Sequence, residues 1–209
     1  EMCIRDRYLL IRFSTIFHDV AVWNWLLMVV GMGTAVMSAV FAVQKTDLKK
    51  LTAYSTVSHL GWIVATIGVG TPFAIAAALV HTLAHALFKS SLFMLIGVID
   101  HEAGSRDIRR LGPLWNKMPW TFGSVVIGAA SMAAVPPLLG FVSKEGMLTA
   151  FEDAPIGGAG QVILLIVAGI GAFFTFTYSA KIVFGAFFDG PRDMEHVLSL
   201  IHISERAGK

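Results

Sequence analysis

Three ionisable side chains, His81, His85 and Lys89, lie four residues apart in an otherwise apolar stretch. At about 100° per residue, positions i, i+4 and i+8 of a helix stay within about 80° of one another, so the three side chains form one stripe. A charged group near a bilayer centre costs roughly 2.5–3.5 kcal/mol on insertion scales, and such groups usually face a bundle interior or a hydrated cavity. The spacing predicts a ladder of proton-exchanging groups. The alternative is a polar patch that only holds helices together.

A second polar row precedes this stripe. Lys49, Thr52, Thr56 and His59, flanked by Ser55, fall within roughly a third of the circumference of a helix. Hydroxyl groups and a neutral imidazole both donate and accept hydrogen bonds, so the row can organise a chain of water molecules. We interpret it as a hydrated half-channel. The alternative is that the hydroxyls bond to carbonyls of their own or neighbouring helices.

Pro136, Pro137 and Gly140 interrupt the fourth long apolar stretch. Neither proline can donate a helical hydrogen bond, so we expect the helix to break here and to resume at 141–151. Discontinuous helices at membrane depth are a recurring feature of secondary transporters. Lys144 follows the break, and a buried lysine readily changes its protonation state. The alternative is a simple kink, with Lys144 extended to the membrane interface.

Five apolar stretches carry these residues, and each is long enough for a bilayer core of about 30 Å, which needs about 20 helical residues. They are roughly residues 20–43, 48–69, 72–99, 119–151 and 160–187, preceded by the end of another helix at Tyr8 to Phe13. The predicted fold is therefore an all-α, polytopic transmembrane helix bundle.

The composition agrees with a membrane protein. Hydrophobic residues make up 56% of the 209 residues and charged residues 14%, and the mean hydropathy is +0.71. A net charge of +2 is too small to indicate a nucleic-acid partner. The single cysteine cannot form an internal disulfide, and neither C-x-x-C nor H-E-x-x-H occurs, so we expect no metal site and no cofactor.

Positive charges gather in alternate loops of the predicted bundle. They are Lys45, Lys49, Lys50, Arg106, Arg109, Arg110, Lys117 and Arg192. Because Lys and Arg accumulate in cytoplasmic loops, the first of the five spans is predicted to run from outside to inside.

Three motifs together resemble the proton-translocating antiporter subunits, which include large membrane-arm subunits of respiratory complex I and large subunits of Mrp-type sodium/proton antiporters. The motifs are D-L-K-K-L-T-A-Y-S-T-V-S-H at 47–59, H-T-L-A-H-A-L-F-K at 81–89 and P-P-L-L-G-F-V-S-K-E at 136–145. The loop I-D-H-E-A-G-S-R-D-I-R-R-L-G at 99–112 resembles, more particularly, the A subunit of Mrp antiporters.

The resemblance implies that the five spans form one of two inverted five-helix repeats, with the discontinuous fourth helix at Pro136. It implies a proton pathway through matching positions of this sequence: Lys49, His81, His85, Lys89 and Lys144. His59 stands where many relatives have Gln.

The implied function is the proton-conducting subunit of a multisubunit Na+/H+ antiporter in a bacterial plasma membrane, which is a transporter subunit rather than an enzyme. Its partners would be the lipid bilayer and the other subunits of the complex. The transported ions would be Na+ and H+. One alternative is a proton-pumping membrane subunit of an NADH-quinone oxidoreductase. Another is a helical scaffold that transports nothing.

The predicted domain organisation centres on the repeat, at residues 20–190. Residues 8–19 would be the end of a preceding helix and its loop, and residues 191–197 the start of a following loop. Within the ends, 1–7 and 198–209, residues 2–7 and 198–203 can be encoded by the two complementary strands of a sequence that resembles a transposase end used in sequencing-library preparation. We therefore expect both ends to be adapter-derived and the chain to be a fragment.

Overall fold

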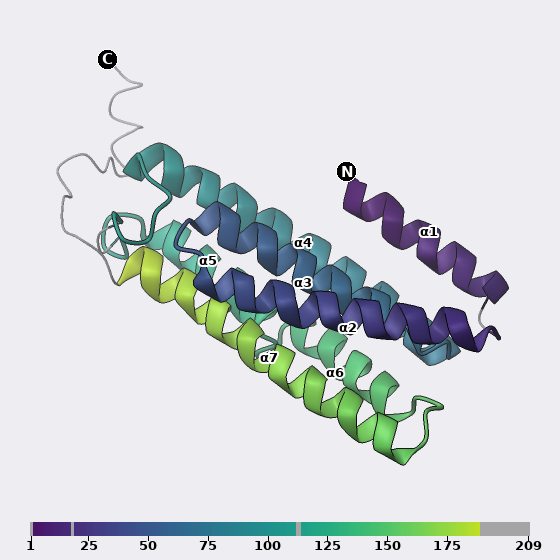
Figure 1. Ribbon diagram of the computed structural model, residues 1–209. Coiled ribbons are helices and arrows are strands. Elements are labelled where there is room, and N and C mark those ends of the chain that lie inside the picture. Colours follow the sequence, from purple (N-terminus) through teal and green to yellow (C-terminus); the bar gives the residue numbers. More distant parts are fainter. Residues whose placement is uncertain (1, 18, 112–113, 189–209) are drawn as a thin grey trace.

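The computed structural model describes residues 2–17, 19–111 and 114–188, so the predicted segments 191–197 and 198–209 lie outside the described residues. The described part is helical and contains α1 (Met2–Phe17), α2 (Ala21–Gln44), α3 (Leu48–Gly68), α4 (Pro72–Ala103), α5 (Pro119–Met132), α6 (Leu139–Glu152) and α7 (Gly158–Phe187) (Figure 1). The prediction of an all-α bundle is confirmed.

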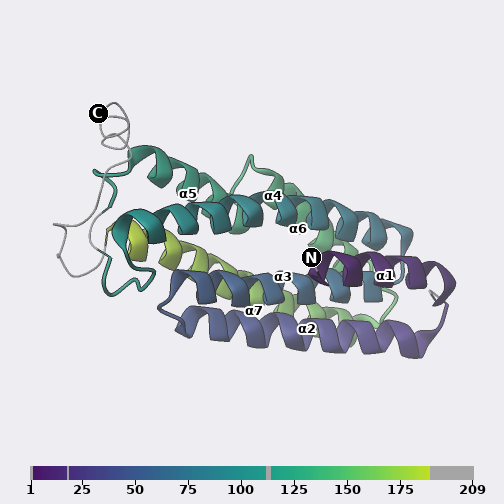
Figure 2. The ribbon, with the colours of Figure 1, turned by 90° about the horizontal axis from the view of Figure 1, so that it is seen from above.

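Five spans close into a ring when α5 and α6 are taken together as one. Helix α2 packs against α3, α3 against α4, α4 against α5 and α6, and α7 against α5, α6 and α2. Helix α1 lies outside this ring and contacts α3 (Figure 2). The side chains that face inward from the ring are therefore brought together from every span.

The predicted span boundaries agree with the helices to within about two residues, except in two places. Helix α4 continues to Ala103, beyond the expected end at residue 99, and it ends where Gly104 adopts a left-handed conformation with φ 65°. The second exception is the preceding helix, α1, which ends at Phe17 rather than at Phe13; α6 begins at Leu139, two residues before the expected 141. Among the described residues α2, α4 and α7 are long and apolar enough to cross a membrane by length and composition.

The predicted discontinuity of the fourth span is confirmed, since α5 ends at Met132 and α6 begins at Leu139. The two halves approach closely where the second one starts. A Cβ atom on Gly140 would lie 1.7 Å from the carbonyl oxygen of Ser131, at the end of α5. Only glycine permits this contact, so Gly140 sets how α6 sits against the end of α5.

Gly140→Ala should therefore destabilise the assembled full-length protein, because backbone must move to admit the methyl group. We expect a loss of about 1–3 kcal/mol, the usual cost of overpacking, measured as a lower thermal-unfolding midpoint. Gly123→Ala on α5 is the matched control, since a Cβ there meets nothing within 4 Å. Equal midpoints for the two variants would contradict this explanation of the break.

Glycines also bring α2 and α3 into close contact. A Cβ on Gly31 would lie 2.5 Å from the backbone nitrogen of Ala65, and one on Gly61 would lie 2.6 Å from that of Ala35. Small residues of this kind let helix backbones pack closely in membranes. The polar positions of α3 are consequently held against α4 and α7, inside the ring.

Two apolar clusters occupy the two ends of the ring. One includes Leu48, Leu92 and Ile182, and the other includes Met28, Ala74 and Leu164. Most buried polar side chains of α3, together with His81, Ser143 and Thr175 on the other helices, come from the parts of these helices between the two clusters. On α4, His85 and Lys89 alternate with residues of the first cluster, such as Phe88 and Leu92. The fold thus encloses a polar layer between apolar ends.

Candidate functional site

Two histidines from different helices meet in this polar layer. His59 on α3 and His81 on α4 are fully buried, and Nδ1 of His59 lies 3.1 Å from Nε2 of His81. Nδ1 of His81 lies 3.0 Å from Oγ of Ser143 on α6. One hydrogen-bonded chain therefore joins three helices, and the direction of each bond depends on which ring nitrogen carries the proton.

The predicted stripe on α4 faces the same layer. The ring of His85 lies 5.4 Å from that of His59, measured between centroids. Lys89, one helical turn further along, is buried, and its Nζ donates to the carbonyl of Thr52 at 3.3 Å and to Oγ of Ser55. The structure thus brings His81, His85 and Lys89 together with the polar row of α3.

Two of the three hydroxyls of that row, those of Ser55 and Thr56, bond locally, as the alternative interpretation held. Oγ of Ser55 and Oγ1 of Thr56 both donate to the carbonyl of Thr52, each at 2.9 Å. Ser55 has a second contact because it also accepts from Lys89. Thr56 is only half-buried and has no such contact in the described geometry.

Lys49 is not brought into the buried chain. It lies exposed in the first turn of α3, where its backbone N–H donates to Oδ1 of the capping residue Asp47 at 2.8 Å. Lys49 is on the same face of α3 as His59, but it is nearer the start of the helix than the buried layer is. This position is at the mouth of the predicted half-channel rather than within it.

Lys144 lies in α6, shortly after the break, and is half-buried. Its Nζ donates to the carbonyl of Met132, at the end of α5, at 3.1 Å. Lys144 also lines a cavity of about 40 Å³, together with Trp62, Phe151 and Thr175. The broken helix therefore supplies a carbonyl acceptor for the ammonium group, and the side chain lines a small, partly open cavity between α3, α6 and α7.

Buried Lys89 and half-buried Lys144 have no carboxylate partner among residues 2–17, 19–111 and 114–188, where the ion pairs involve other groups. Glu145, next to Lys144 in the sequence, is exposed. Glu102 is buried, but its carboxylate lies 3.2 Å from Nδ1 of His101. A proton on either lysine is consequently held by neutral hydrogen-bond acceptors.

Sequence reasoning missed three residues of the site: Ser143, Thr175 and Tyr178. The hydroxyl of Tyr178, on α7, lies 3.2 Å from Nε2 of His59 and 3.2 Å from Oγ1 of Thr175. The available signal was the spacing of Thr175, Tyr178 and Ser179, which places three hydroxyls on one face of an apolar span.

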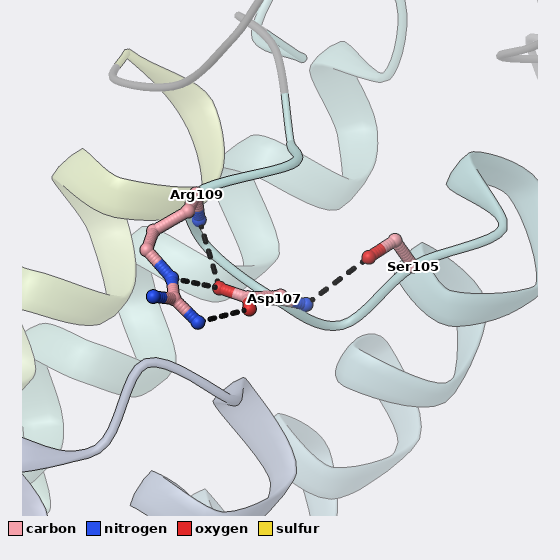
Figure 3. Close-up of polar contacts among 3 residues, drawn as sticks. All are labelled: Ser105, Asp107 and Arg109. Atoms are coloured by element: carbon pink, nitrogen blue, oxygen red, sulfur yellow. Dashed lines mark hydrogen bonds and ion pairs between the residues drawn. The ribbon is translucent and has the colours of Figure 1, made fainter.

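A loop clasp closes one end of the ring. Backbone N–H groups donate in both directions between the α2–α3 turn and the α4–α5 loop: Leu48 to the Arg106 carbonyl and Ile108 to the Thr46 carbonyl, each at 3.0 Å. Figure 3 shows how Asp107 orders this loop, with bonds from the backbone N–H and the guanidinium of Arg109. The loop that carries the most particular sequence motif thus fixes the start of α3.

The hydrogen bonds from Arg109 lower the pKa of the Asp107 carboxyl below its usual range. Since the pKa is lowered on folding, the carboxylate stabilises the clasp above its unfolded-state pKa, and this contribution is lost as the pH falls through the folded-state pKa. In the full-length protein we expect Asp107→Asn to reduce protection of the Leu48 and Ile108 amides from hydrogen exchange a few-fold at neutral pH. Asp153→Asn is the control, since Asp153 is exposed at the end of α6 and takes no part in the clasp; equal effects would contradict the role of Asp107.

The buried groups have the chemistry of proton exchange. Neutral imidazole accepts a proton at one nitrogen and releases one from the other, and lysine switches between charged and neutral forms. Lys89, the histidines and Lys144 are distributed over α3, α4 and α6. Hydrogen bonds join His59, His81 and Ser143, Lys89 lies one turn from His85, and Lys144 follows Ser143 in the sequence. This arrangement can pass protons between the two halves of the ring.

Comparisons with known proteins extend over most of the chain. A family model described as "NADH:quinone oxidoreductase/Mrp antiporter, TM" matches residues 6–175. The chain is 43% identical to the A subunit of a Na(+)/H(+) antiporter of Bacillus subtilis and 42% identical to the A/B subunit of a probable K(+)/H(+) antiporter of Rhizobium meliloti, matching 86% and 88% of this chain. It covers 24% and 18% of those proteins, so it spans about a fifth of their length.

A solved structure agrees with these matches. The structure of the Mrp complex from Dietzia sp. DQ12-45-1b superposes with a TM-score of 0.82 at 55% sequence identity, over 90% of this chain and 21% of the chain in that complex. The helix arrangement described above is therefore similar to part of a larger membrane protein.

Proposed function

We propose, from the premise that this chain belongs to the NADH:quinone oxidoreductase/Mrp antiporter transmembrane family, that it is the proton-conducting part of the A subunit of a cation/proton antiporter. The chain is a multi-pass membrane protein of the bacterial plasma membrane. In the proposal, residues 20–190 form one proton-translocating repeat, and the full-length protein acts together with the other subunits of its complex.

One observation carries the proposal: the buried His59–His81 pair. Lys89 lies two turns beyond His81 on α4, and Ser143, which is hydrogen-bonded to His81, is followed in the sequence by Lys144. Packing alone does not require the ionisable side chains of His59, His81, Lys89 and Lys144 inside the ring. A proton that enters beside Lys89 meets an exchangeable group at each step across the ring.

The relatives favour a cation as the exchanged ion, since their names describe antiporters of Na+ or K+. We propose Na+ as the ion and leave its binding to parts of the full-length complex beyond this chain. Lys49, at the exposed start of α3, would serve as the proton entrance.

The test is cation-driven proton movement by the full-length protein, assembled with its partner subunits and reconstituted in acid-loaded vesicles with a trapped pH-sensitive dye. Added Na+ should make the interior more alkaline, because protons leave as the cation enters, and K+ in place of Na+ reports the selectivity. A pH change that requires NADH and a quinone, and ignores both cations, would instead support the respiratory-pump alternative.

A further inference from the structure

Helix α7 contributes a buried pair of hydroxyls that no part of the predicted pathway includes. Tyr178 and Thr175 are both fully buried. The Tyr178 hydroxyl donates to Oγ1 of Thr175 at 3.2 Å, and the same oxygen lies 3.2 Å from Nε2 of His59. The pair thus extends the histidine chain to a fourth helix.

The phenol has a single hydrogen, so the acceptor that Tyr178 donates to determines the direction of the neighbouring hydrogen bonds. If Tyr178 donates to Thr175, its oxygen accepts from Nε2–H of His59. Neutral His59 then accepts at Nδ1 from Nε2–H of His81, and His81 accepts at Nδ1 from the hydroxyl of Ser143. Every bond of the chain points from α6 towards α7.

The same atoms also support the opposite direction. Oγ of Ser143 can donate to the carbonyl of Gly140 at 3.0 Å and accept from His81 instead. The chain then reverses through both histidines, and Tyr178 donates to His59. At the α7 end, Oγ1 of Thr175 has its own carbonyl acceptor, that of Gly171, at 2.8 Å. A carbonyl at each end therefore satisfies the last donor in either direction.

Thr175 also reaches the surroundings of Lys144. Both side chains line the cavity of about 40 Å³ between α6 and α7. A cavity holds one water molecule when roughly 10–15 Å³ of it is open to the centre of that molecule and polar groups are there to bind it. Among the residues that line this mostly apolar cavity, Lys144 carries an ammonium group and Thr175 a hydroxyl, and a single water molecule bound to both would join them.

We propose that Tyr178 and Thr175 form a branch of the proton relay that connects His59 to Lys144 through water in this cavity. The inference rests on the proposed function and adds residues to its pathway. With an excess proton on His59, Nε2–H passes its proton to the Tyr178 oxygen, and the Tyr178 hydroxyl proton passes to Thr175. Thr175 releases its own proton to the water, which protonates unprotonated Lys144. His59 loses one proton and Lys144 gains one, while each hydroxyl is restored.

The experiment compares substitutions on α7 in the full-length, assembled and reconstituted complex, with antiport rate and its solvent deuterium isotope effect as readouts. Tyr178→Phe and Thr175→Val should each lower the rate about tenfold or more, since a positioned proton-transfer group contributes roughly 10²–10⁴-fold. Thr175→Ser keeps the hydroxyl and should retain a rate close to that of the unmodified protein, with the same isotope effect.

Matched controls come from the same chain. Thr177→Val removes a hydroxyl from α7 that bonds to the Phe173 carbonyl at 2.8 Å, on a residue that is only half-buried. Tyr54→Phe removes a phenol hydroxyl from an exposed tyrosine. Both should leave the antiport rate unchanged.

Two results would overturn the branch. The first is that Tyr178→Phe transports within about twofold of the rate of the unmodified complex, while Lys144→Ala is inactive in the same assay. This result refutes the branch but leaves the proposed function standing. The second is an equal loss in Thr175→Ser and Thr175→Val, which assigns Thr175 to packing. If Tyr178→Phe does not assemble, the Thr175 variants decide. Full antiport in Lys144→Ala would refute the proposed function itself.

Discussion

Lys144→Ala should abolish cation-driven proton movement in the full-length, assembled complex while leaving assembly intact. The substitution removes an exchangeable group on α6, whose Nζ bonds to the Met132 carbonyl and whose side chain lines the cavity shared with Thr175. We expect a loss of at least about 100-fold in the antiport rate, as for removal of an essential proton-transfer group. Assembly should survive because alanine favours the helix and Lys144 has no ion-pair partner among the described residues.

Two further substitutions separate proton exchange from charge. Lys144→Arg keeps a positive charge that is not released near neutral pH, so it should be as inactive as Lys144→Ala. Glu145→Gln changes an exposed neighbour in the same helix and should be as active as the unmodified complex. Antiport retained in Lys144→Arg would contradict a role for Lys144 in taking up and releasing protons.

His81→Gln should cause the second large loss. His81 is the junction of the chain, with Nε2 next to His59 and Nδ1 next to Ser143. A glutamine amide can form hydrogen bonds at this position but cannot exchange a proton near neutral pH, so we expect the antiport rate to fall about 10²–10⁴-fold. The measurement is the initial rate of the dye signal after Na+ addition.

His101→Gln is the matched control for this experiment, since His101 lies in the last turn of the same helix with its side chain largely exposed. It should leave the rate unchanged. If His81→Gln conducts at the unmodified rate, protons do not pass through the pair of imidazoles.

The spans and their break could be predicted because their causes are local. Apolar length determines which segments cross the bilayer, and prolines without an N–H donor end a helix wherever they occur. The inward orientation of His81, His85 and Lys89 followed from the cost of placing charges against lipid. Each of these features depends on neighbours within a few positions of one another in the sequence.

The contacts between helices could not be predicted in the same way. Tyr178 meets His59 across 119 positions of sequence, and this contact depends on the return of α7 into the ring beside α3. The clasp depends likewise on backbone bonds between two loops. Lys49 illustrates the converse: its helical angle matches that of His59, but its position in the first turn places it outside the buried layer.

The most direct test of proton transfer through the polar layer neutralises the stripe as a whole. His81→Gln, His85→Gln and Lys89→Met are combined in the full-length protein, assembly of the complex is verified, and proton movement is recorded in reconstituted vesicles after addition of Na+. We predict no cation-driven change in internal pH from an assembled complex. A normal change from that complex would show that the buried groups only hold the helices together.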